Sequence, residues 1–536
     1  MANAALLLLT AFPLVAFVRD PSGIWNATYI ATFLLTSVLP TVLYVCSLWS
    51  EKAHQRELVA MSIGLKSPSG RKFVGFFHPY CNAGGGGERV LWTAIAFMQR
   101  TEPDVVSVVY SGDVNVTKEQ IIEKVKARFD ITLAPSSLHF VFLNSRRYVE
   151  DSTWPRFTLL GQSVGSMYLA WEAMSKFIPD LYIDTMGYAF TFHVVAWLTG
   201  IPIGAYVHYP TISTDMLARV QSRRQGHTNS NTISSSVVLS SGKLMYYRLF
   251  MYHYAKALRR ASFVMANSTW TKNHVNAILQ HSDPLLEALH APFYILLLPF
   301  SLLLKVLLPS PSPHKQTTPD HADAVYPPCD TRAMASFPLT GRERILVSVA
   351  QPEKDHAAQV RALDALFRKC PEYKAGGSPV RLVLIGGVRN EGDAERVEGL
   401  RKLASELNLS DSVEFVVNAS YPVMLSYLAR ASVGLSTMVD EHFGINVVEY
   451  MAAGVIPVAH ASAGPLYDIV LPVDGQPTGF HAKTTDEFAD AIRSALVLSP
   501  EEDEAMRRRG RESAVRRFSE AEFERGWEGS GWKRWL

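Results

Sequence analysis

Short apolar runs rich in β-branched residues alternate with longer amphipathic stretches over most of the chain. We expect each short run to form a strand, at residues 72–78, 105–110, 139–143, 181–184, 203–208, 262–266, 344–350, 380–385, 413–417, 433–436 and 455–459. Strands that alternate with helix-length segments are typical of parallel sheets joined by crossover helices. Residues 309–328, which are rich in Pro, Ser, Thr, His and Asp, interrupt the series. The pattern therefore predicts two α/β units separated by a loop.

The two units set the expected domain boundaries. We assign residues 70–285 to the first unit and residues 336–500 to the second, followed by a C-terminal helical segment at 501–536. In doubly wound sheets, ligands bind beyond the carboxyl ends of the strands. Two such units are therefore expected to face a shared cleft, and the informative side chains should follow strands.

The beginning of the chain is strongly apolar. Residues 24–49 contain no charged side chain. As a helix this segment would be about 39 Å long, which exceeds the roughly 30 Å of a hydrocarbon core. It predicts a transmembrane helix within an N-terminal membrane anchor at residues 1–50. Another apolar run at residues 4–18 leaves two arrangements open, a hairpin or one span with an interfacial piece.

Basic residues near this segment predict its orientation. Lys52, Arg56 and Lys66 follow the segment, whereas only Arg19 precedes it within a similar distance. Because positive residues favour the cytoplasmic side of a membrane, we expect the large C-terminal part to lie in the cytosol.

A second apolar stretch occupies residues 291–304, within an expected insertion at 286–335. Its 14 uncharged residues are few for a membrane crossing. The length favours a segment that lies against the bilayer, and a buried core helix or a true crossing stay open as alternatives.

Composition excludes several other classes of protein. Hydrophobic residues make up 48% of the chain and the net charge is +2, so the chain is not of the disordered type. The near balance of 52 basic and 50 acidic residues also leaves no overall positive field to hold a nucleic acid. Four scattered cysteines are too few for a disulfide scaffold and suit a reducing compartment.

A run of four glycines follows the first expected strand, in the segment HPYCNAGGGGERVLW, which begins at His78. Glycines ahead of a helix-like run let the backbone approach a ligand closely and aim helix N-terminal amides at phosphate oxygens. Neither a dinucleotide fingerprint nor a P-loop is present. The run consists of Gly84, Gly85, Gly86 and Gly87. Glu88 and Arg89 follow in the first helical turn, where an ordinary solvated pair is the alternative interpretation.

The corresponding segment of the second unit is DEHFGINVVE, residues 440–449, which follows the strand at 433–436. It opens a helix that we expect to end at Gly454. Glu441 stands in the loop, where it could bond a sugar hydroxyl, and Glu449 lies about two turns along the helix. The amides of Gly444, Ile445 and Asn446 can bind a diphosphate with help from the helix dipole.

This pair of acids resembles the E-x7-E motif of the retaining GT-B glycosyltransferases of family 4. The strings HPYCNAGGGGERVLW, IDTMGYAF, YVHYPTIS, VYPPCDT, EKDH and EHFGINVVEYMAAGVIPVAHASAGP narrow the resemblance to the dolichol-linked α-1,2-mannosyltransferases of asparagine-linked glycosylation. They extend from residue 78 to residue 465. The resemblance implies a GT-B fold, in which two Rossmann-like domains face a cleft.

The resemblance also implies roles for particular residues. In the second half, Glu441 would contact the mannose of GDP-mannose and Glu449 the ribose. The donor phosphates would meet the amides from Phe443 to Asn446, and Lys354 would neutralise the diphosphate leaving group. In the first half, His208 would lie near the reacting sugar, and the glycine run would line the cleft by the acceptor and donor phosphates.

The implied reaction transfers mannose from GDP-mannose, with retention, to Man3GlcNAc2-PP-dolichol and Man4GlcNAc2-PP-dolichol. It would add the fourth and fifth mannoses as α-1,2 linkages on the cytosolic face of the endoplasmic reticulum. The reaction that the resemblance implies requires no metal or other cofactor, and consistently no D-x-D or H-E-x-x-H string occurs. No side chain is an obvious covalent nucleophile. Expected partners are the two substrates, the membrane and other mannosyltransferases of the dolichol pathway, with no nucleic acid.

The sequence departs from the family pattern at one place. The family pattern around the lysine is Q-F-R-P-E-K. Here Gln351 is followed directly by Pro352, so the phosphate-binding arginine of the family has no counterpart. Two alternatives therefore stay open. One is another lipid-linked glycosyltransferase of the same fold, and the other is a catalytically weak or silent scaffold that recruits pathway partners.

Overall fold

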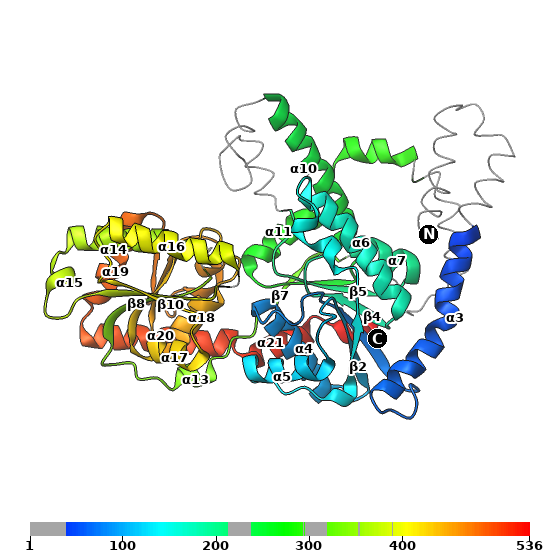
Figure 1. Ribbon diagram of the computed structural model, residues 1–536, viewed down its shortest axis with the longest axis horizontal. Helices are drawn as coiled ribbons and strands as arrows, with labels where there is room; N and C mark the ends of the chain where they lie inside the picture. The colour runs from blue at the N-terminus through cyan, green and yellow to red at the C-terminus, as the bar shows by residue number, and fades with distance from the viewer. Residues whose placement is uncertain (1–38, 213–236, 293, 295–318, 352–353, 389) are drawn as a thin grey trace.

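The computed structural model describes residues 39–212, 237–292, 294, 319–351, 354–388 and 390–536. They form two α/β domains that lie side by side (Figure 1). We call them the N domain and the C domain. Each is built on one parallel sheet, as the alternation of strands and helices predicts.

The N-domain sheet has the strand order β3-β2-β1-β4-β5-β6-β7, with every neighbouring pair parallel. Its strands are β1 (Lys72–Phe77), β2 (Val105–Ser111), β3 (Leu138–Phe142), β4 (Leu181–Asp184), β5 (Ile203–Val207), β6 (Phe263–Ala266) and β7 (Asp323–Ala324). Its helices are α3 (Leu39–Ser62), α4 (Gly86–Thr101), α5 (Lys118–Phe129), α6 (Thr158–Lys176), α7 (Thr191–Thr199), α10 (Val237–Leu258) and α11 (Thr269–Leu279). All seven residues of β2 are buried, because helices cover both faces of the sheet.

The C-domain sheet has the order β10-β9-β8-β11-β12-β13, again all parallel. Its strands are β8 (Glu343–Val349), β9 (Arg381–Gly386), β10 (Val413–Val417), β11 (Ala431–Ser436), β12 (Ile456–His460) and β13 (Phe480–Ala482). Its helices are α13 (Arg332–Ala335), α14 (His356–Lys369), α15 (Glu372–Ala375), α16 (Glu391–Glu406), α17 (Tyr421–Arg430), α18 (Ile445–Ala453), α19 (Thr485–Leu496) and α20 (Pro500–Phe518). Capping boxes at Thr484 and Ser499 fix the starts of α19 and α20.

The strand orders locate the ligand-binding edge of each sheet. In the N domain the order reverses between β1 and β4, and in the C domain it reverses between β8 and β11. A crevice opens beyond the carboxyl ends of the strands at such a switch point. The segments that follow these four strands begin at His78, Thr185, Ala350 and Thr437.

The strands expected from the sequence all occur, with boundaries that differ by no more than two residues. The two short edge strands β7 and β13 escape the pattern, because an edge strand of two or three residues needs no apolar run. β7 pairs with β6. Residues 323–324 therefore belong to the N-domain sheet, and their assignment to an insertion at 286–335 is wrong.

The predicted membrane segments lie largely outside the described residues, which exclude 24–38, 293 and 295–304. Residues 39–49 form the first half of α3, where Val45 and Leu48 are buried against the N domain. None of the helices in the described part of the chain is both long enough and apolar enough to cross a membrane. The N-terminal transmembrane helix and the membrane contact at 291–304 stay predictions.

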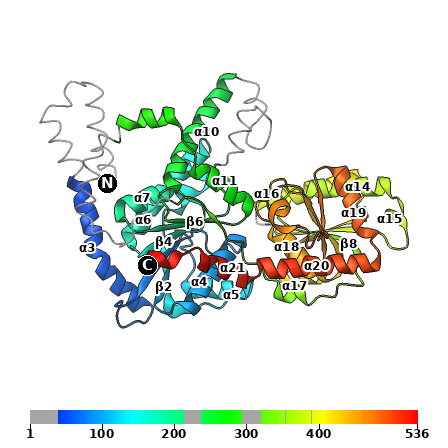
Figure 2. The same ribbon diagram turned by 180° about the vertical axis from the view of Figure 1, so that it is seen from behind.

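The end of the chain crosses back from the C domain to the N domain. After α20, which packs on the C domain, α21 (Glu520–Gly529) and a short turn of helix at Trp532–Trp535 lie on the N domain (Figure 2). Phe523, Trp527 and Trp532 are buried in the same core as α4 and α5. The segment that the sequence assigns as one C-terminal helical unit therefore belongs to both domains.

We predict that Trp527→Ala destabilises the N domain by about 3–5 kcal/mol, because the indole stacks on Phe76 and Tyr206 and leaves a cavity when removed. Thermal unfolding of the purified chain measures the loss. An unchanged unfolding midpoint would show that the crossing helix is not part of the N-domain core.

Candidate active site

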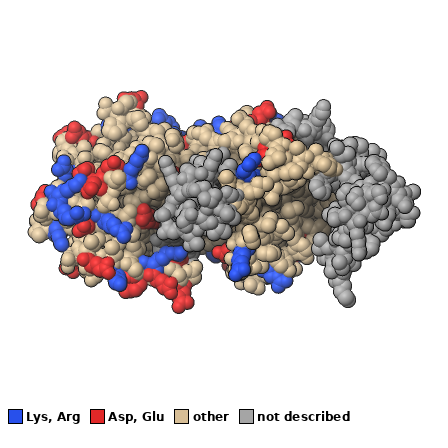
Figure 3. All heavy atoms as spheres, turned by 90° about the horizontal axis from the view of Figure 1, so that it is seen from above, with Lys and Arg blue, Asp and Glu red and all other residues tan. Residues whose placement is uncertain are grey.

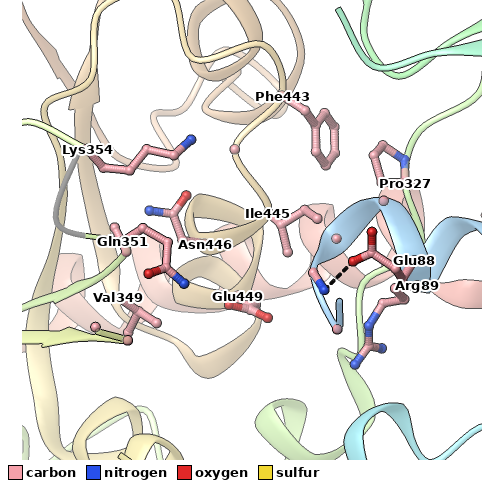
Figure 4. Close-up of a pocket in the computed structure, with 18 of the residues that line it drawn as sticks. Glu88, Arg89, Pro327, Val349, Gln351, Lys354, Phe443, Ile445, Asn446 and Glu449 are labelled. Carbon is pink, nitrogen blue, oxygen red and sulfur yellow. Dashed lines mark hydrogen bonds between the residues drawn. The ribbon is translucent and has the colours of Figure 1, made fainter. Parts of the chain in front are cut away.

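The carboxyl edges of the two sheets face each other across a cleft of about 930 Å³. The side chains that line it come from both domains and point toward one another (Figure 4). All of the site residues predicted from the sequence line this cleft: Gly84, Gly85, Gly86, Gly87, Glu88, Arg89, His208, Lys354, Glu441, Phe443, Gly444, Ile445, Asn446 and Glu449. The structure therefore brings all of them together, and their roles toward a ligand stay predictions.

The start of α18 is shaped to receive an anion. Gly444, which precedes the helix, has φ of 109°, a conformation that a side chain would strain. Hydrogen bonds within the helix begin with the amide of Val447, which donates to the Gly444 carbonyl at 3.0 Å. The preceding amides of Ile445 and Asn446 have no earlier carbonyl within the helix to bond. The helix ends at Gly454, as predicted.

Lys354 and Glu441 form an ion pair beside this helix start. The Lys354 Nζ donates to Glu441 Oε2 at 2.6 Å. The lysine side chain is 32% exposed and the glutamate side chain only 11%. Because this ammonium is partly exposed and is held by one carboxylate, it can turn toward a second anion.

Glu449 is half-buried in the cleft and faces the N domain. Burial raises the pKa of its carboxyl to about 7, although Arg89 acts in the opposite direction. Arg128 of the N domain also acts on this carboxyl, and its Nε donates to the Gly84 carbonyl at 3.3 Å. Two arginines of the N domain therefore face an acid of the C domain.

The glycine run is held by a buried acid. Glu88 accepts a hydrogen bond from the Gly85 amide and a second from His78 Nε2 at 3.3 Å. Burial by itself would raise the pKa of Glu88, but the hydrogen bond and charge of His78 and the Gly85 amide outweigh it and lower the pKa. Glu88 therefore stays ionised and fixes the shape of the loop. The alternative interpretation as a solvated surface residue is wrong.

His208 is neutral and firmly oriented. Burial lowers its pKa to about 4, and its Nε2 donates to the Thr185 carbonyl at 3.2 Å. The Thr185 hydroxyl in turn lies 2.8 Å from His78 Nδ1. His208 therefore cannot act as a proton donor at neutral pH, but it can orient a sugar hydroxyl.

The two domains touch at the cleft through small and aromatic groups. A methyl group on Gly86 would lie 2.7 Å from Ile445 Cδ1, the flexible end of that side chain, so the two domains approach closely at this point. His442 stacks on Tyr209 of the N domain, with ring centroids 4.0 Å apart. Asp468 accepts hydrogen bonds from the Thr269 amide and the Tyr326 hydroxyl, each at 2.9 Å.

Comparison with known proteins assigns both domains. Residues 71–279 match the family model described as "ALG11 mannosyltransferase N-terminus", and residues 332–513 match "Glycosyl transferases group 1". The chain is 43% identical to the GDP-Man:Man(3)GlcNAc(2)-PP-Dol alpha-1,2-mannosyltransferase of Mus musculus, over 90% of this chain and 91% of that protein. The chain belongs to this mannosyltransferase family. The protein of the same name from Homo sapiens is 42% identical over 88% of each chain.

Solved structures agree on the fold of this mannosyltransferase-family chain. A glycosyltransferase from Rickettsia africae ESF-5 superposes with a TM-score of 0.52 at 13% identity, covering 87% of this chain and 99% of that one. Anabaena Alr3699/HepE in complex with UDP and glucose gives 0.51 at 14% identity, covering 85% and 98%. At such low identity the likeness shows the fold alone, which is the GT-B arrangement of two parallel-sheet domains.

Sequence reasoning missed several residues that shape the cleft of this family member. His78 stands in the glycine-run motif, and its signal was its place directly after β1. Arg128 closes the same loop from α5, where the sequence shows only an ordinary basic helix end. His442 and Tyr209 meet only after both domains fold. The loop residues 352–353, which carry the departure from the family pattern, lie outside the described residues.

The described part of this mannosyltransferase-family chain contains no obvious set of metal ligands. Over the residues that the structure describes, no three His, Cys, Asp or Glu side chains gather as metal ligands. The expectation of a reaction without metal stays a prediction.

We predict that Gly86→Ala lowers kcat/KM by only about two- to fivefold, because the added methyl group meets the flexible end of the Ile445 side chain, which can rotate away. Since alanine favours the start of a helix, the unfolding midpoint should not fall. Gly87→Ala is the matched comparison, because its methyl group would meet His208 at an ordinary 3.5 Å, and it should have a smaller effect. Equal losses for the two variants would contradict the close domain contact.

We also predict that kcat/KM for the donor rises with pH through about 7, the raised pKa of Glu449. The ionised carboxylate accepts hydrogen bonds from hydroxyl groups, and protonation below this pH weakens that acceptor. The ionised fraction grows roughly tenfold between pH 6 and pH 8. In Glu449→Gln the rise should disappear, and a rise that survives in this variant would exclude Glu449 as its cause.

Proposed function

We propose that this chain transfers mannose from GDP-mannose to Man3GlcNAc2-PP-dolichol and then to Man4GlcNAc2-PP-dolichol, forming α-1,2 linkages. The observation that carries the proposal is the cleft itself. The ion pair of Lys354 with Glu441, the start of α18, the glycine run and His208 all line one space between two domains. The relatives that cover most of the chain carry this activity in their names.

The donor diphosphate would lie between the start of α18 and Lys354. Negative charge grows on the departing GDP as its bond to the sugar breaks. The amides of Ile445 and Asn446 are aimed at this position before the reaction, and the Lys354 ammonium stands beside them. Such preorganised donors stabilise developing charge without reorganisation, which is the largest contribution in many enzymes.

The mannose would lie between Glu441 and His208, one from each domain. Glu441 accepts hydrogen bonds from sugar hydroxyls, and His208 presents a neutral ring that cannot protonate the leaving group. We assign no covalent nucleophile, since Glu441 is held by Lys354. We therefore favour attack by the acceptor on the face that GDP leaves, with retention of configuration.

The acceptor would approach from the N domain, which carries the predicted membrane segments. We place the protein at the endoplasmic reticulum membrane with both domains on the cytosolic side. This placement follows from the basic residues after the predicted anchor. Other mannosyltransferases of the dolichol pathway are the protein partners we expect.

A silent scaffold is the second candidate, supported only by the arginine missing before Pro352. The intact Lys354–Glu441 pair speaks against it, because a chain free of catalytic selection has no need to keep a partly exposed ion pair inside a cleft.

The direct test is incubation of the purified chain with GDP-mannose and a lipid-linked trimannosyl acceptor. Two mannoses should be added, and an α-1,2-specific mannosidase should remove both. Transfer from UDP-N-acetylglucosamine instead would favour another lipid-linked glycosyltransferase. No transfer from any donor would favour the scaffold.

We predict that Lys354→Met and Glu441→Gln each lower kcat by about a hundredfold or more, since each removes a charge from the reacting centre. The double variant should be equally inactive, because both groups act on the substrate. Lys369→Met is the control, since Lys369 pairs with Asp490 on the outer surface of the same domain. Recovery of activity in the double variant would show that the pair has only a structural role.

A further inference from the structure

The outer side of α6 is apolar, whereas a surface helix normally presents polar residues there. Phe157, just before the helix, is 70% exposed, and Leu160, Val164 and Tyr168 are 48%, 54% and 39% exposed. Their spacing of three and four residues places them on one side of the helix. Fifteen consecutive residues, 157–171, include no charged side chain.

The opposite side of α6 fixes this orientation. A methyl group on Gly161 would lie 2.3 Å from the Trp154 ring, and one on Gly165 would lie 1.9 Å from the Tyr148 carbonyl oxygen. Glycine thus lets the helix lie directly on the chain beneath it. The helix cannot rotate to bury its apolar side without breaking these contacts.

Aromatic rings extend the exposed side of α6 onto two neighbouring helices. The ring centroids of Tyr168 and Trp171 lie 5.3 Å apart, and those of Trp171 and Tyr44 of α3 lie 6.3 Å apart. At the other end, Phe157 meets Tyr246 of α10 at 5.9 Å. We call this surface the apolar face and define it by Tyr44, Phe157, Leu160, Val164, Tyr168, Trp171, Met245, Tyr246 and Leu249.

Basic side chains flank the apolar face, although Arg248 is paired with Asp283 and the acid Glu172 directly follows Trp171. Arg156 precedes it, and the charged residues of α10 are Lys243, Arg248 and Lys256. Figure 3, which looks onto the side from which α10 projects, shows few charged side chains on the visible part of the N domain. The C domain carries many of both signs in the same view.

Two uncharged stretches of the sequence adjoin helices that lie near this face. Leu39 and Leu43 of α3 are 46% and 60% exposed, and the uncharged residues 24–38 directly precede them. The helix at residues 284–292 packs on α10, with His290 5.3 Å from Tyr252, and the uncharged residues 295–304 follow it. An exposed apolar surface of this extent is typical of an interaction site.

We propose that the apolar face lies on a lipid bilayer, at the boundary between headgroups and acyl chains. Tyrosine and tryptophan rings with polar edges prefer this depth, and flanking basic side chains favour anionic headgroups. The face would hold the N-domain half of the cleft at a fixed height above the membrane. The proposal rests on the proposed function in one respect, the lipid-borne acceptor.

A fluorescent label at residue 164 tests this contact. The full chain with Cys46→Ser and Val164→Cys is labelled with an environment-sensitive dye and reconstituted into vesicles of phosphatidylcholine and phosphatidylserine. The other three cysteines are buried, so the label is specific. Val497→Cys is the control, because Val497 is 63% exposed on the C domain.

We expect nitroxide-bearing lipids to quench the label at 164 and aqueous iodide to leave it bright, with the reverse at 497. Equal iodide quenching at both positions would overturn the proposal. Protection at 164 from both quenchers would also overturn it, since a protein surface would then cover the face.

Activity gives an independent test. Leu160→Asn with Val164→Asn should lower transfer to a dolichol-linked acceptor in vesicles about fivefold or more. Transfer to a short, water-soluble isoprenoid acceptor should be unchanged, and Val497→Asn should affect neither. Parallel losses on both acceptors would show that the face is only structural. A wild-type chain inactive on both would refute the proposed function, while the quenching result would still decide the membrane contact.

Discussion

The ion pair between Lys354 and Glu441 is the contact on which the rest of the site depends. It holds an ammonium and a carboxylate at the start of α18 before any ligand is present, at a separation of 2.6 Å. The pair is neither sealed nor fully solvated. Each group can therefore keep part of its interaction with the other while it meets a phosphate or a hydroxyl. A pyrophosphate brought to this place meets a cation and the amide end of a helix together.

Both sheets are arranged around this contact. The strand order of each reverses at a switch point, and the chain segments that leave β1, β4, β8 and β11 carry most of the groups that line the cleft, while His208 follows β5. The last helix then crosses back to complete the N-domain core with Trp527 and Trp532. The N domain therefore depends on chain from the far end of the sequence, which crosses over from the C domain.

Much of this arrangement could be predicted from the sequence. Buried parallel strands appear in the sequence as apolar runs. Gly444 and Gly454 mark the two ends of α18, because each has a backbone conformation that glycine permits. The predicted site residues line one cleft because they follow strands, and parallel strands place such segments at one edge. The family resemblance supplied their roles, which the spacing alone does not.

The rest depended on tertiary contacts that no local pattern encodes. β7 is an edge strand of only two residues. The sequence of α21 is that of an ordinary amphipathic helix, and only the folded structure shows that it packs on α4. The buried side chain of His78 contacts both Glu88 and Thr185, and these three residues come from three separate segments of the chain. The stacking of His442 on Tyr209 exists only when both domains are in place. The raised pKa of Glu449 likewise reflects burial between domains rather than its position in a motif.

The central claim is that the cleft grips a nucleotide by its diphosphate through Lys354 and the start of α18. Titration calorimetry of the purified chain with GDP and with GMP measures that grip directly. The account predicts that GDP binds about tenfold or more tightly than GMP, and that Lys354→Met removes most of the difference. Equal binding of the two nucleotides, or a preference for GDP that survives in Lys354→Met, would contradict it.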